Sequence, residues 1–439
     1  MNYLQFYKNS QRRLSETLLS MWASGQESNQ KYFKKLLEEE PLLAEPVFQA
    51  TFPWMPSSLV FEQLTDVFDE NFIKSLDQIE DPDYHFPKDR APYLHQVDSW
   101  KELLLNQKSI VVTSGTGSGK TECFMIPVIQ DLLRQKIEGH TTGVQAIFLY
   151  PLNALMNSQQ KRMRAWCKAV NPQITFAIYN GNTEEENIPR QKQNEAYPEL
   201  ITRKAIRETV PQILFTNPTM LEYMLVRKKD QDILKQSQGK LRWILLDETH
   251  TYSGSAAAEL SMQIRRILDA FGVTIQQVRF ASTSATIGSD NEEQLKRFIA
   301  QLTGKSLNEI AVINGKQVLP KIKDTQKTDI VTEMLRQDLV LGGALSAREI
   351  GRRYKPDATI EESLEIIDKL GNKIPDLVDT GKSDALLPTR AHFFIRSIGG
   401  VFVCTNPRCD RHMEERPLIG SMTTYMKTTC ECGAPLLEL

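Results

Sequence analysis

Residues 109–122 read Ser-Ile-Val-Val-Thr-Ser-Gly-Thr-Gly-Ser-Gly-Lys-Thr-Glu, and this stretch decides the fold. Apolar residues, most of them branched at the β-carbon, open it, and a loop of glycines and hydroxyl residues follows. After Lys120-Thr121-Glu122 the sequence becomes apolar again, with Cys123-Phe124-Met125-Ile126. This order predicts a buried strand, a tight loop and the first turn of a helix.

A glycine-rich loop between a strand and a helix is a geometry that binds phosphate. Glycines let backbone N–H groups approach phosphate oxygens, and the positive end of the helix adds to the attraction. We expect Lys120 to reach the β- and γ-phosphates of a nucleotide and Thr121 to bind Mg²⁺. The strict pattern has glycine in place of Ser114, so a loop without a ligand is the alternative. The expected phosphate-binding residues are Ser114, Gly115, Thr116, Gly117, Ser118, Gly119, Lys120 and Thr121.

The length and composition are those of an ordinary globular chain. Its 439 residues suffice for roughly two to four domains, and 41% are hydrophobic. Lys and Arg number 53 against 55 Asp and Glu, so affinity for nucleic acid would need a local basic patch. No signal peptide and no run of about 18 apolar residues is present, which predicts a cytoplasmic protein that does not contact a membrane.

Short apolar runs recur after the phosphate-binding loop, most of them separated by segments with helical periodicity. They are residues 146–150, 174–178, 213–215, 243–246 and 278–280. Such runs are typical of strands buried in a parallel sheet. We therefore predict an α/β fold with a doubly wound parallel sheet, whose ligands bind at the carboxyl ends of the strands.

The acidic pair Asp247-Glu248 directly follows one of these runs. Asp247 would hold Mg²⁺ directly or through water, while Glu248 would orient and deprotonate the attacking water in nucleotide hydrolysis. A solvated acidic turn is the alternative. Upstream of the loop, the amide of Gln96 can both donate to and accept from an adenine edge.

The motifs, taken together, resemble those of superfamily-two DEAD/DEAH-box helicases. They occur in the order of that family: Gln96, residues 114–121, 150–155 with Gln159, 179–182, 216–221, 247–250 and 284–286. The resemblance covers about residues 90–290 and implies the first of the two RecA-like lobes of such an enzyme. The family accepts serine in place of the first loop glycine, which weakens the objection from Ser114.

This resemblance implies a role for each matched residue. Gln96 would read adenine, and Lys120 and Thr121 would bind the phosphates and Mg²⁺. The Asp247-Glu248 pair would serve hydrolysis, and the same motif adds His250 to the candidate catalytic residues. ATP and Mg²⁺ are therefore the expected cofactors.

The resemblance also implies a path for a single nucleic-acid strand. Residues 151–155, Gly181 and residues 216–218 would contact its backbone, which agrees with turns and helix N-termini presenting N–H groups to phosphates. Basic residues within 161–168 and 227–229 follow two of these segments. Solvated helix faces are an equally open interpretation of those basic clusters.

A second lobe is expected to be missing from this chain. In the family, Ser284 and Thr286 would couple the lobes, and arginines of the second lobe complete the ATP site. Residues 290–439 show neither another alternating core nor a Gln-x-x-Gly-Arg-x-x-Arg pattern. We expect the second lobe in a longer chain or a partner subunit, and weak or no motor activity from this chain alone. The alternative is a nucleotide-controlled nucleic-acid-binding module without hydrolysis of its own.

Four of the six cysteines lie near the C-terminal end, as Cys404-x₄-Cys409 and Cys430-x-Cys432. Two close thiol pairs can supply four thiolates to a tetrahedral Zn²⁺, so we predict a structural zinc site. The spacings depart from C-x₂-C, and His412 is the reserve ligand. An iron–sulfur cluster and unligated thiols stay open as alternatives.

The remaining segments complete the predicted organisation. The expected domains are a helical accessory domain 1–88, a RecA-like ATP-binding lobe 89–290, a helical connector 291–388 and a cysteine-rich zinc module 389–439. Capping boxes at Ser289, Ser346 and Thr359, each with glutamate three residues on, predict helix starts in the connector. Residues 390–396 alternate basic and aromatic side chains, which suits either phosphate binding with base stacking or core packing.

A narrower resemblance rests on residues 250–254, His-Thr-Tyr-Ser-Gly. This segment resembles the large bacterial helicases of the mitomycin-repair type and their relatives in phage-defence systems such as Druantia. It implies an ATP-dependent DNA helicase or translocase of DNA repair or phage defence, with single-stranded or partly duplex DNA as partner.

Overall fold

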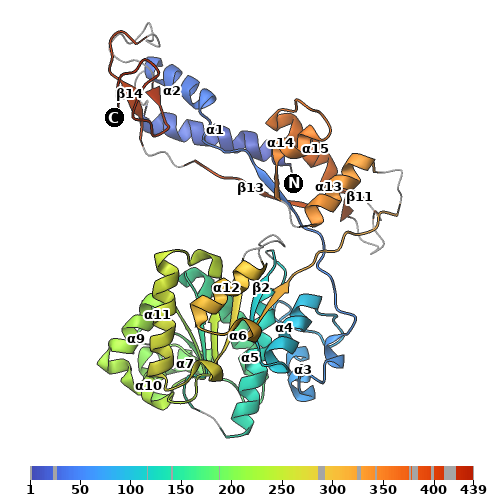
Figure 1. Ribbon diagram of the computed structural model, residues 1–439, viewed down its shortest axis with the longest axis vertical. Helices are drawn as coiled ribbons and strands as arrows, with labels where there is room; N and C mark the ends of the chain where they lie inside the picture. The colour runs from blue at the N-terminus through green and yellow to red at the C-terminus, as the bar shows by residue number, and fades with distance from the viewer. Residues whose placement is uncertain are drawn as a thin grey trace. The chain divides into compact units, whose positions relative to one another are not determined.

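The computed structural model describes residues 2–22, 27–115, 117–139, 142–186, 188–284, 292–323, 328–341, 344–374, 377, 384–396, 400–409 and 422–438. The chain forms two compact units (Figure 1). One unit is Trp54–Gln317, and the other combines Met1–Pro53 with Val318–Leu439.

The unit Trp54–Gln317 is built on an eight-stranded sheet with the order β5-β4-β6-β3-β7-β8-β2-β9. Every neighbouring pair of strands is parallel. The strands are β2 Ser109–Thr113, β3 Ala146–Leu149, β4 Phe176–Ile178, β5 Glu199–Leu200, β6 Ile213–Thr216, β7 Trp243–Leu246, β8 Arg279–Ser284 and β9 Ile310–Asn314. All five apolar runs predicted as strands are strands, so the doubly wound α/β fold is confirmed.

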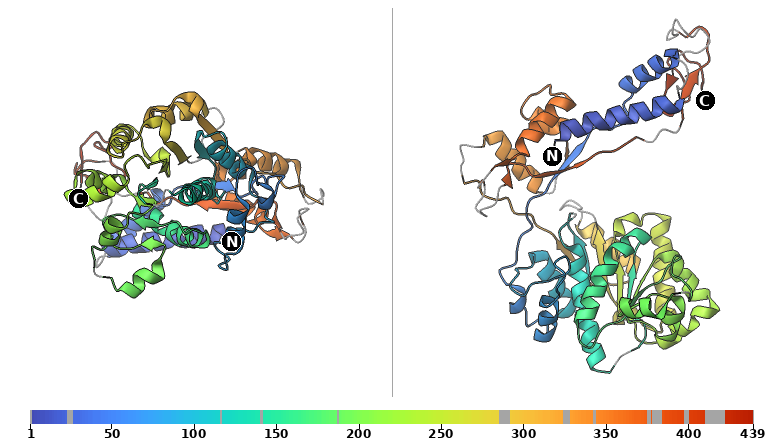
Figure 2. Two further views of the ribbon diagram at one scale, coloured as in Figure 1. Left: turned by 90° about the horizontal axis from the view of Figure 1, so that it is seen from below. Right: turned by 180° about the vertical axis from the view of Figure 1, so that it is seen from behind.

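Helices cover both faces of this sheet, as Figure 2 lets the reader follow. They are α3 Glu70–Asp77, α4 Leu94–Leu104, α5 Lys120–Ile137, α6 Asn153–Ala169, α7 Arg190–Ala196, α8 Arg203–Glu208, α9 Pro218–Val226, α10 Gln231–Gln236, α11 Ser255–Ala270 and α12 Glu292–Thr303. Alternate residues of β3 serve opposite faces: Phe148 packs in the cluster with α4, α5 and α6, while Ile147 packs in the cluster with α9, α10 and α11. This double burial explains why the strands read as continuous apolar runs.

A buried carboxylate fixes the starts of two central strands. Asp131 of α5 accepts hydrogen bonds from Arg242 (2.9 Å), from the indole N–H of Trp243 (2.7 Å) and from Arg279 (3.0 Å). The Arg279 guanidinium also lies over the Trp243 ring, 3.9 Å from its centre. Burial opposes ionisation of Asp131, but the hydrogen bonds and charges of the two arginines outweigh it and lower its pKa. The cluster ties α5 to the first residues of β7 and β8.

The second unit is organised around β1 Val47–Ala50, which pairs antiparallel with a strand on either side in the order β10-β1-β13. Its other elements are α1 Tyr3–Trp22, α2 Glu27–Glu39, α13 Ile330–Val340, β10 Ala344–Ser346, α14 Ala347–Arg352, α15 Ile360–Leu370, β11 Lys373–Ile374, β12 Asp384–Ala385, β13 Thr389–His392, β14 Phe402–Cys404, β15 Met422–Thr423 and β16 Leu436–Glu438. The start of α1 packs on α15, where Asp368 accepts the N–H groups of Tyr3 and Leu4.

The capping boxes at Ser346 and Thr359 are confirmed as the starts of α14 and α15. The box at Ser289 lies outside the described residues. Three-residue 3₁₀ turns complete the secondary structure, at Phe61–Gln63, Lys228–Asp230, Thr249–Thr251, Ile275–Gln277 and Leu307–Glu309. Among the described residues, none of the helices combines the length and the apolar character that crossing a bilayer requires.

The two units divide the chain differently from the predicted boundaries at residues 88, 290 and 388. The N-terminal region splits because β1 pairs with β10 and β13, whereas Phe61 and Phe68 pack against Trp100 of α4. The lobe extends beyond residue 290 because β9 adds to the parallel sheet beside β2. Both differences come from pairings between segments far apart in sequence.

Replacing Asp131 with alanine would leave Arg242 and Arg279 without their shared carboxylate. We expect the free energy of unfolding of this unit to fall by about 3–5 kcal/mol at pH 7, the usual cost of removing one partner from a buried pair. Urea unfolding followed by tryptophan fluorescence measures the change. Asp232→Ala is the matched control, because it removes only the exposed pair with Lys235 and should cost less than about 0.5 kcal/mol.

The pH dependence gives a second measurement on the same variant. Because the folded protein lowers the pKa of Asp131, its ionisation stabilises the fold above the unfolded pKa of about 3.9 and stops doing so as the pH falls through the folded value. The stability difference between the wild type and Asp131→Ala should therefore narrow at acid pH. Equal stabilities of the two proteins at pH 7 would contradict this account.

Candidate functional site

The phosphate-binding loop connects the end of β2 to the start of α5, at the carboxyl edge of the sheet. Gly117 and Gly119 have φ angles of 80° and 75°, a region where side chains are strained. A β-carbon on Gly119 would also lie 2.3 Å from Nε2 of Gln96. Ser114, which replaces the first glycine of the strict pattern, is buried and exchanges a 2.6 Å hydrogen bond with Ser118. Thr116 lies outside the described residues.

Two side chains of α4 contact backbone carbonyl groups of the loop. Gln96 donates from Nε2 to the carbonyl of Gly119 (3.2 Å) and accepts the N–H of Tyr93 at Oε1 (2.9 Å). His95 lies with Nε2 2.8 Å from the carbonyl oxygen of Ser118, and burial lowers its pKa. Gln96 is therefore beside the loop as expected, and its contact with adenine stays a prediction. His95 is a structural support of the loop.

The acidic pair follows β7, and a threonine of the next strand orients it. The hydroxyl of Thr283 donates to Oδ1 of Asp247 and accepts the N–H of Glu248 at 2.9 Å. Burial raises the pKa of Asp247, Glu248 adds to this, and the ammonium of Lys120 acts in the opposite direction. Lys120 and Asp247 thus influence each other across one edge of the sheet, where a metal-bound nucleotide would need both.

Glu248 adopts an unusual backbone conformation, with φ 50° and ψ 50°. A residue other than glycine in this left-handed region carries strain that the surroundings must sustain, and such strain is frequent at functional sites. The side chain of Glu248 lies 3.2 Å from Nδ1 of the exposed His250. The structure therefore brings together Lys120, Asp247, Glu248 and His250, while their catalytic roles stay predictions.

The segments expected to contact nucleic acid also lie at the carboxyl ends of β-strands of this sheet. Asn217 caps α9 by accepting the N–H of Met220 (2.7 Å), and its amide donates to Asn153 at the start of α6 (2.9 Å). The two helix N-termini are thereby linked side by side. Gly181 follows β4, and no heavy atom of another described residue lies within 4 Å of where its β-carbon would be.

Several of the basic residues near this path already have partners. Arg164 pairs with the buried Glu199, and Arg162 lies 3.3 Å from Glu122. Lys161, Lys168, Lys228 and Lys229 are exposed. The arginines of α6 are thus part of the fold, whereas contact between the exposed lysines and phosphates stays a prediction.

Sequence reasoning assigned no role to Thr283, which orients the acidic pair and directly precedes the motif 284–286. It also did not predict a set of unpartnered buried hydroxyl groups at this edge. The hydroxyl groups of Tyr150 and Tyr252 are buried with no hydrogen-bond partner among the described residues, as is that of Ser284. Burial, with the charge of Asp247 next in size, raises the pKa of Tyr252 to about 12. Tyr252 does belong to the segment 250–254, the one signal that pointed to it.

The four C-terminal cysteines converge as predicted. Their sulfur atoms all lie within 4.8 Å of one another, with Cys404 and Cys432 3.6 Å apart and Cys409 and Cys430 3.9 Å apart. Four thiolates at about 2.3 Å from one tetrahedral zinc would be about 3.8 Å apart, which these two separations match. A cluster of several irons would need more widely spaced sulfurs.

The local backbone suits a metal-binding knuckle. Gly433, at φ 85°, turns the chain after Cys432, and the carbonyl of Ala434 accepts the N–H of Cys430 at 2.8 Å. The amide of Asn406 donates to the sulfur of Cys432 at 3.5 Å. Donors directed at a sulfur atom favour its thiolate form, the form that binds zinc. His412, the reserve ligand, lies outside the described residues, and zinc itself stays a prediction.

Residues 93–295 match the family model of the DEAD/DEAH box helicases. This part of the chain is a DEAD/DEAH box helicase domain. Its limits enclose Gln96, the phosphate-binding loop and the acidic pair, so the family match and the site geometry concern the same residues.

Relatives of the helicase domain share low to moderate identity with it. The Druantia protein DruE of Escherichia coli is 22% identical over 79% of this chain and 27% of its own length. The ATP-dependent helicase YprA of Bacillus subtilis is 28% identical over 49% of this chain and 25% of its own length. The ATP-dependent helicase hrq1 of Schizosaccharomyces pombe is 27% identical over 55% of this chain and 21% of its own length. The chain thus spans about a quarter of the length of these curated relatives.

Solved structures of helicases also resemble parts of the chain. The DUF1998 helicase MrfA bound to DNA is 23% identical, with a TM-score of 0.41 over 68% of this chain and 36% of MrfA. Mss116p, bound to single-stranded RNA and AMP-PNP, is 16% identical, with a TM-score of 0.46 over 61% of this chain and 47% of Mss116p.

If the four cysteines hold zinc, the purified chain should carry close to one zinc per molecule by elemental analysis. Cys404→Ser and Cys430→Ser should each lose it, because a structural site needs all four ligands. Cys167→Ala, which alters a buried cysteine of the other unit, should retain the metal. A chelator should lower the melting temperature of the unit that contains the cysteines. Full zinc content in the double variant Cys404→Ser/Cys430→Ser would contradict the site.

Proposed function

We propose that this chain supplies the ATP-binding and ATP-hydrolysing lobe of a DNA helicase or translocase. The observation that carries the proposal is the meeting of Lys120, Asp247 and Glu248 at one edge of the parallel sheet, inside the matched helicase domain. A nucleotide-binding fold without hydrolysis has no need of a second carboxylate next to the one that holds magnesium.

The proposed reaction assigns a task to each of these residues. Backbone N–H groups of the loop and the ammonium of Lys120 bind the phosphates, and Gln96 recognises adenine. Thr121 and Asp247 hold Mg²⁺, which when bound neutralises charge on the phosphates. Glu248 accepts a proton from water as the water oxygen attacks the γ-phosphorus and the bond to the β–γ bridging oxygen breaks. His250, 3.2 Å from Glu248, positions that carboxylate.

The proposed nucleic-acid partner is single-stranded or partly duplex DNA. The linked N-termini of α6 and α9 would bind its phosphates, together with Gly181 and the exposed lysines. The relative DruE is named a Druantia protein, and hrq1 is named an ATP-dependent helicase. Together with the resemblance of residues 250–254 to repair and phage-defence helicases, they support a role in one of these processes, and we propose that the protein acts in the cytoplasm.

Movement along DNA needs a second lobe, which we place in a longer chain or in a partner subunit. The described residues contain one parallel sheet of the RecA-like kind, and the remaining sheets have two or three strands. Without arginines from a second lobe, the transferred phosphoryl group lacks part of its charge stabilisation. Because only one such sheet is present among the described residues, a second candidate function remains open: a nucleotide-controlled DNA-binding module without hydrolysis of its own.

An ATPase assay with and without single-stranded DNA tests the proposal. The wild-type chain should release phosphate slowly, and the addition of its second lobe should raise the rate by about 10³-fold or more. Lys120→Ala should weaken ATP binding, because it removes the charge that reaches the phosphates. Glu248→Gln should keep ATP binding and reduce hydrolysis by about 10²-fold or more, because only the proton acceptor is lost.

The matched control for these variants is Glu222→Gln, on the exposed surface of α9. It removes a carboxylate of the same unit outside the nucleotide site and should leave the rate of hydrolysis without DNA unchanged. ATP binding by fluorescence titration separates the two candidate functions. Tight binding with no hydrolysis, even when the second lobe is present, would favour the binding module.

A further inference from the structure

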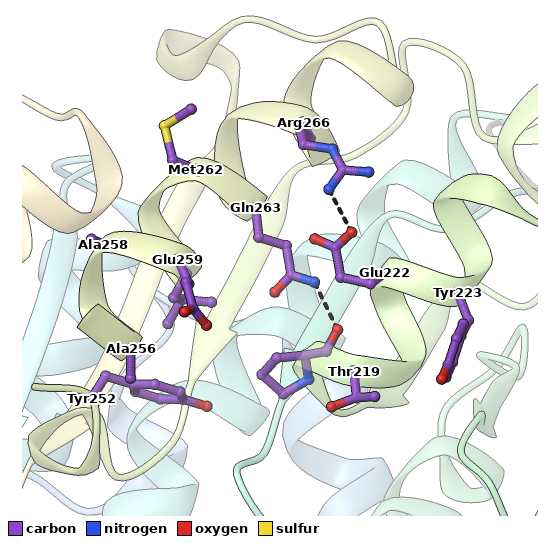
Figure 3. A pocket seen from close by; sticks show the side chains of 12 residues that line it. Thr219, Glu222, Tyr223, Tyr252, Ala256, Ala258, Glu259, Met262, Gln263 and Arg266 are labelled. Carbon is purple, nitrogen blue, oxygen red and sulfur yellow. Dashed lines mark hydrogen bonds and ion pairs between the residues drawn. The ribbon is translucent and has the colours of Figure 1, made fainter. Parts of the chain in front are cut away.

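A groove lies between α9 and α11 on one face of the helicase domain (Figure 3). Its volume is about 850 Å³, and it is lined by Pro218, Thr219, Glu222, Tyr223, Tyr252, Ala256, Ala258, Glu259, Leu260, Met262, Gln263 and Arg266. Its floor is fixed, because the amide of Gln263 donates to the carbonyl of Pro218 at 2.7 Å and so ties α11 to the start of α9.

The groove continues into the proposed path of the DNA strand. A smaller hollow of about 350 Å³ is lined by residues 151–153 and 217–219, and it shares Pro218, Thr219 and Tyr252 with the groove. A strand whose phosphates meet the N-termini of α6 and α9 therefore has its bases within reach of the groove. Nothing in the helicase motifs assigns a ligand to the surface between α9 and α11.

The charges that line the groove exclude phosphate as its occupant. Glu222 and Glu259 contribute two carboxylates, and the guanidinium of Arg266 is already paired with Glu222. A phosphate would therefore meet an excess of negative charge. The same carboxylates suit the exocyclic amino groups of nucleobases, which donate hydrogen bonds to acidic side chains.

The other side chains of the groove suit a planar, mostly apolar ligand. Tyr223 and Met262 are exposed by 49% and 62%, so their apolar surfaces are available to a ligand in the groove. Tyr252 lies at the junction with the strand path, and its buried hydroxyl has no hydrogen-bond partner among the described residues. Buried hydroxyls in folded proteins nearly always have a partner. A rotation of the Tyr252 side chain that turns the hydroxyl toward the groove would let an incoming ligand supply the missing one.

We propose that this groove receives an unpaired base of the bound DNA strand, with Tyr252 hydrogen-bonding the base and Tyr223 and Met262 packing against it. The inference rests on the proposed binding of DNA along the N-termini of α6 and α9. It adds a base-binding site beside the phosphate contacts, and stacking of a base on aromatic side chains tolerates any sequence. Adenine, cytosine and guanine, which carry exocyclic amino groups, should bind better than thymine, which has none.

The experiment uses single strands of about 16 nucleotides that carry one 2-aminopurine at successive positions. This fluorescent base has an exocyclic amino group, and its emission reports stacking. Binding of the full chain, measured separately by anisotropy, should change the emission by roughly twofold or more at one or two adjacent positions and little elsewhere. The anisotropy measures strand binding as a whole, independently of the groove.

Two variants test whether the groove causes that change. Tyr252→Phe removes only the hydroxyl, and Met262→Ser removes the apolar side chain that packs on the base from a position exposed by 62%. Both should reduce the emission change by at least about threefold, and the loss of anisotropy-measured affinity should be smaller, because the phosphate contacts remain. Tyr197→Phe, an exposed tyrosine outside the groove, is the control and should behave as the wild type.

The outcomes separate this inference from the proposed function. If the strand binds but both variants keep the full emission change, the base lies elsewhere and the inference is wrong while DNA binding stands. If the wild-type chain with its second lobe does not bind the strand, both fail together. A groove that serves a protein partner instead would give the first of these results.

Discussion

The structure depends on the order of three neighbouring strands, β7, β8 and β2. Because they are parallel, the residues that follow β7 and β2 lie at one edge of the sheet, on either side of the end of β8. Thr283 of β8 binds Asp247 and the backbone of Glu248, and so sets the position of the acidic pair relative to the loop that carries Lys120. This strand order is what brings Lys120 and Asp247 to the same edge of the sheet.

The opposite ends of β7 and β8 are held in place by contacts with α5. Asp131 collects the side chains of Arg242, Trp243 and Arg279 and thereby fixes where β7 and β8 begin relative to α5. Helix α5 in turn starts at Lys120. Lys120 and the acidic pair are therefore connected through α5, the buried carboxylate of Asp131 and β7. The energetic cost of this arrangement is the desolvation of the Asp131 carboxylate.

The sequence was sufficient to predict elements whose signal is local. The apolar runs at 146–149 and 243–246 are buried on both faces, and the boxes at Ser346 and Thr359 are satisfied by glutamates three residues away. The sequence was insufficient where strands pair across long distances in the chain. Strand β1 pairs with β10 and β13, about three hundred residues later in the sequence, and β9 extends the parallel sheet beyond residue 290. The unpaired hydroxyl of Tyr252 depends on how α11 packs, which no local pattern records.

The phosphate-binding loop is also braced by the first and last segments of the unit Trp54–Gln317. Trp54 and Gln317 pair as antiparallel neighbours, and the ring of Trp54 contacts that of His95, whose Nε2 meets the carbonyl of Ser118. A β-carbon on Gly315 would lie 2.5 Å from Cβ of Ser114 and 2.9 Å from the Trp54 ring. The loop cannot shift toward either segment without displacing it.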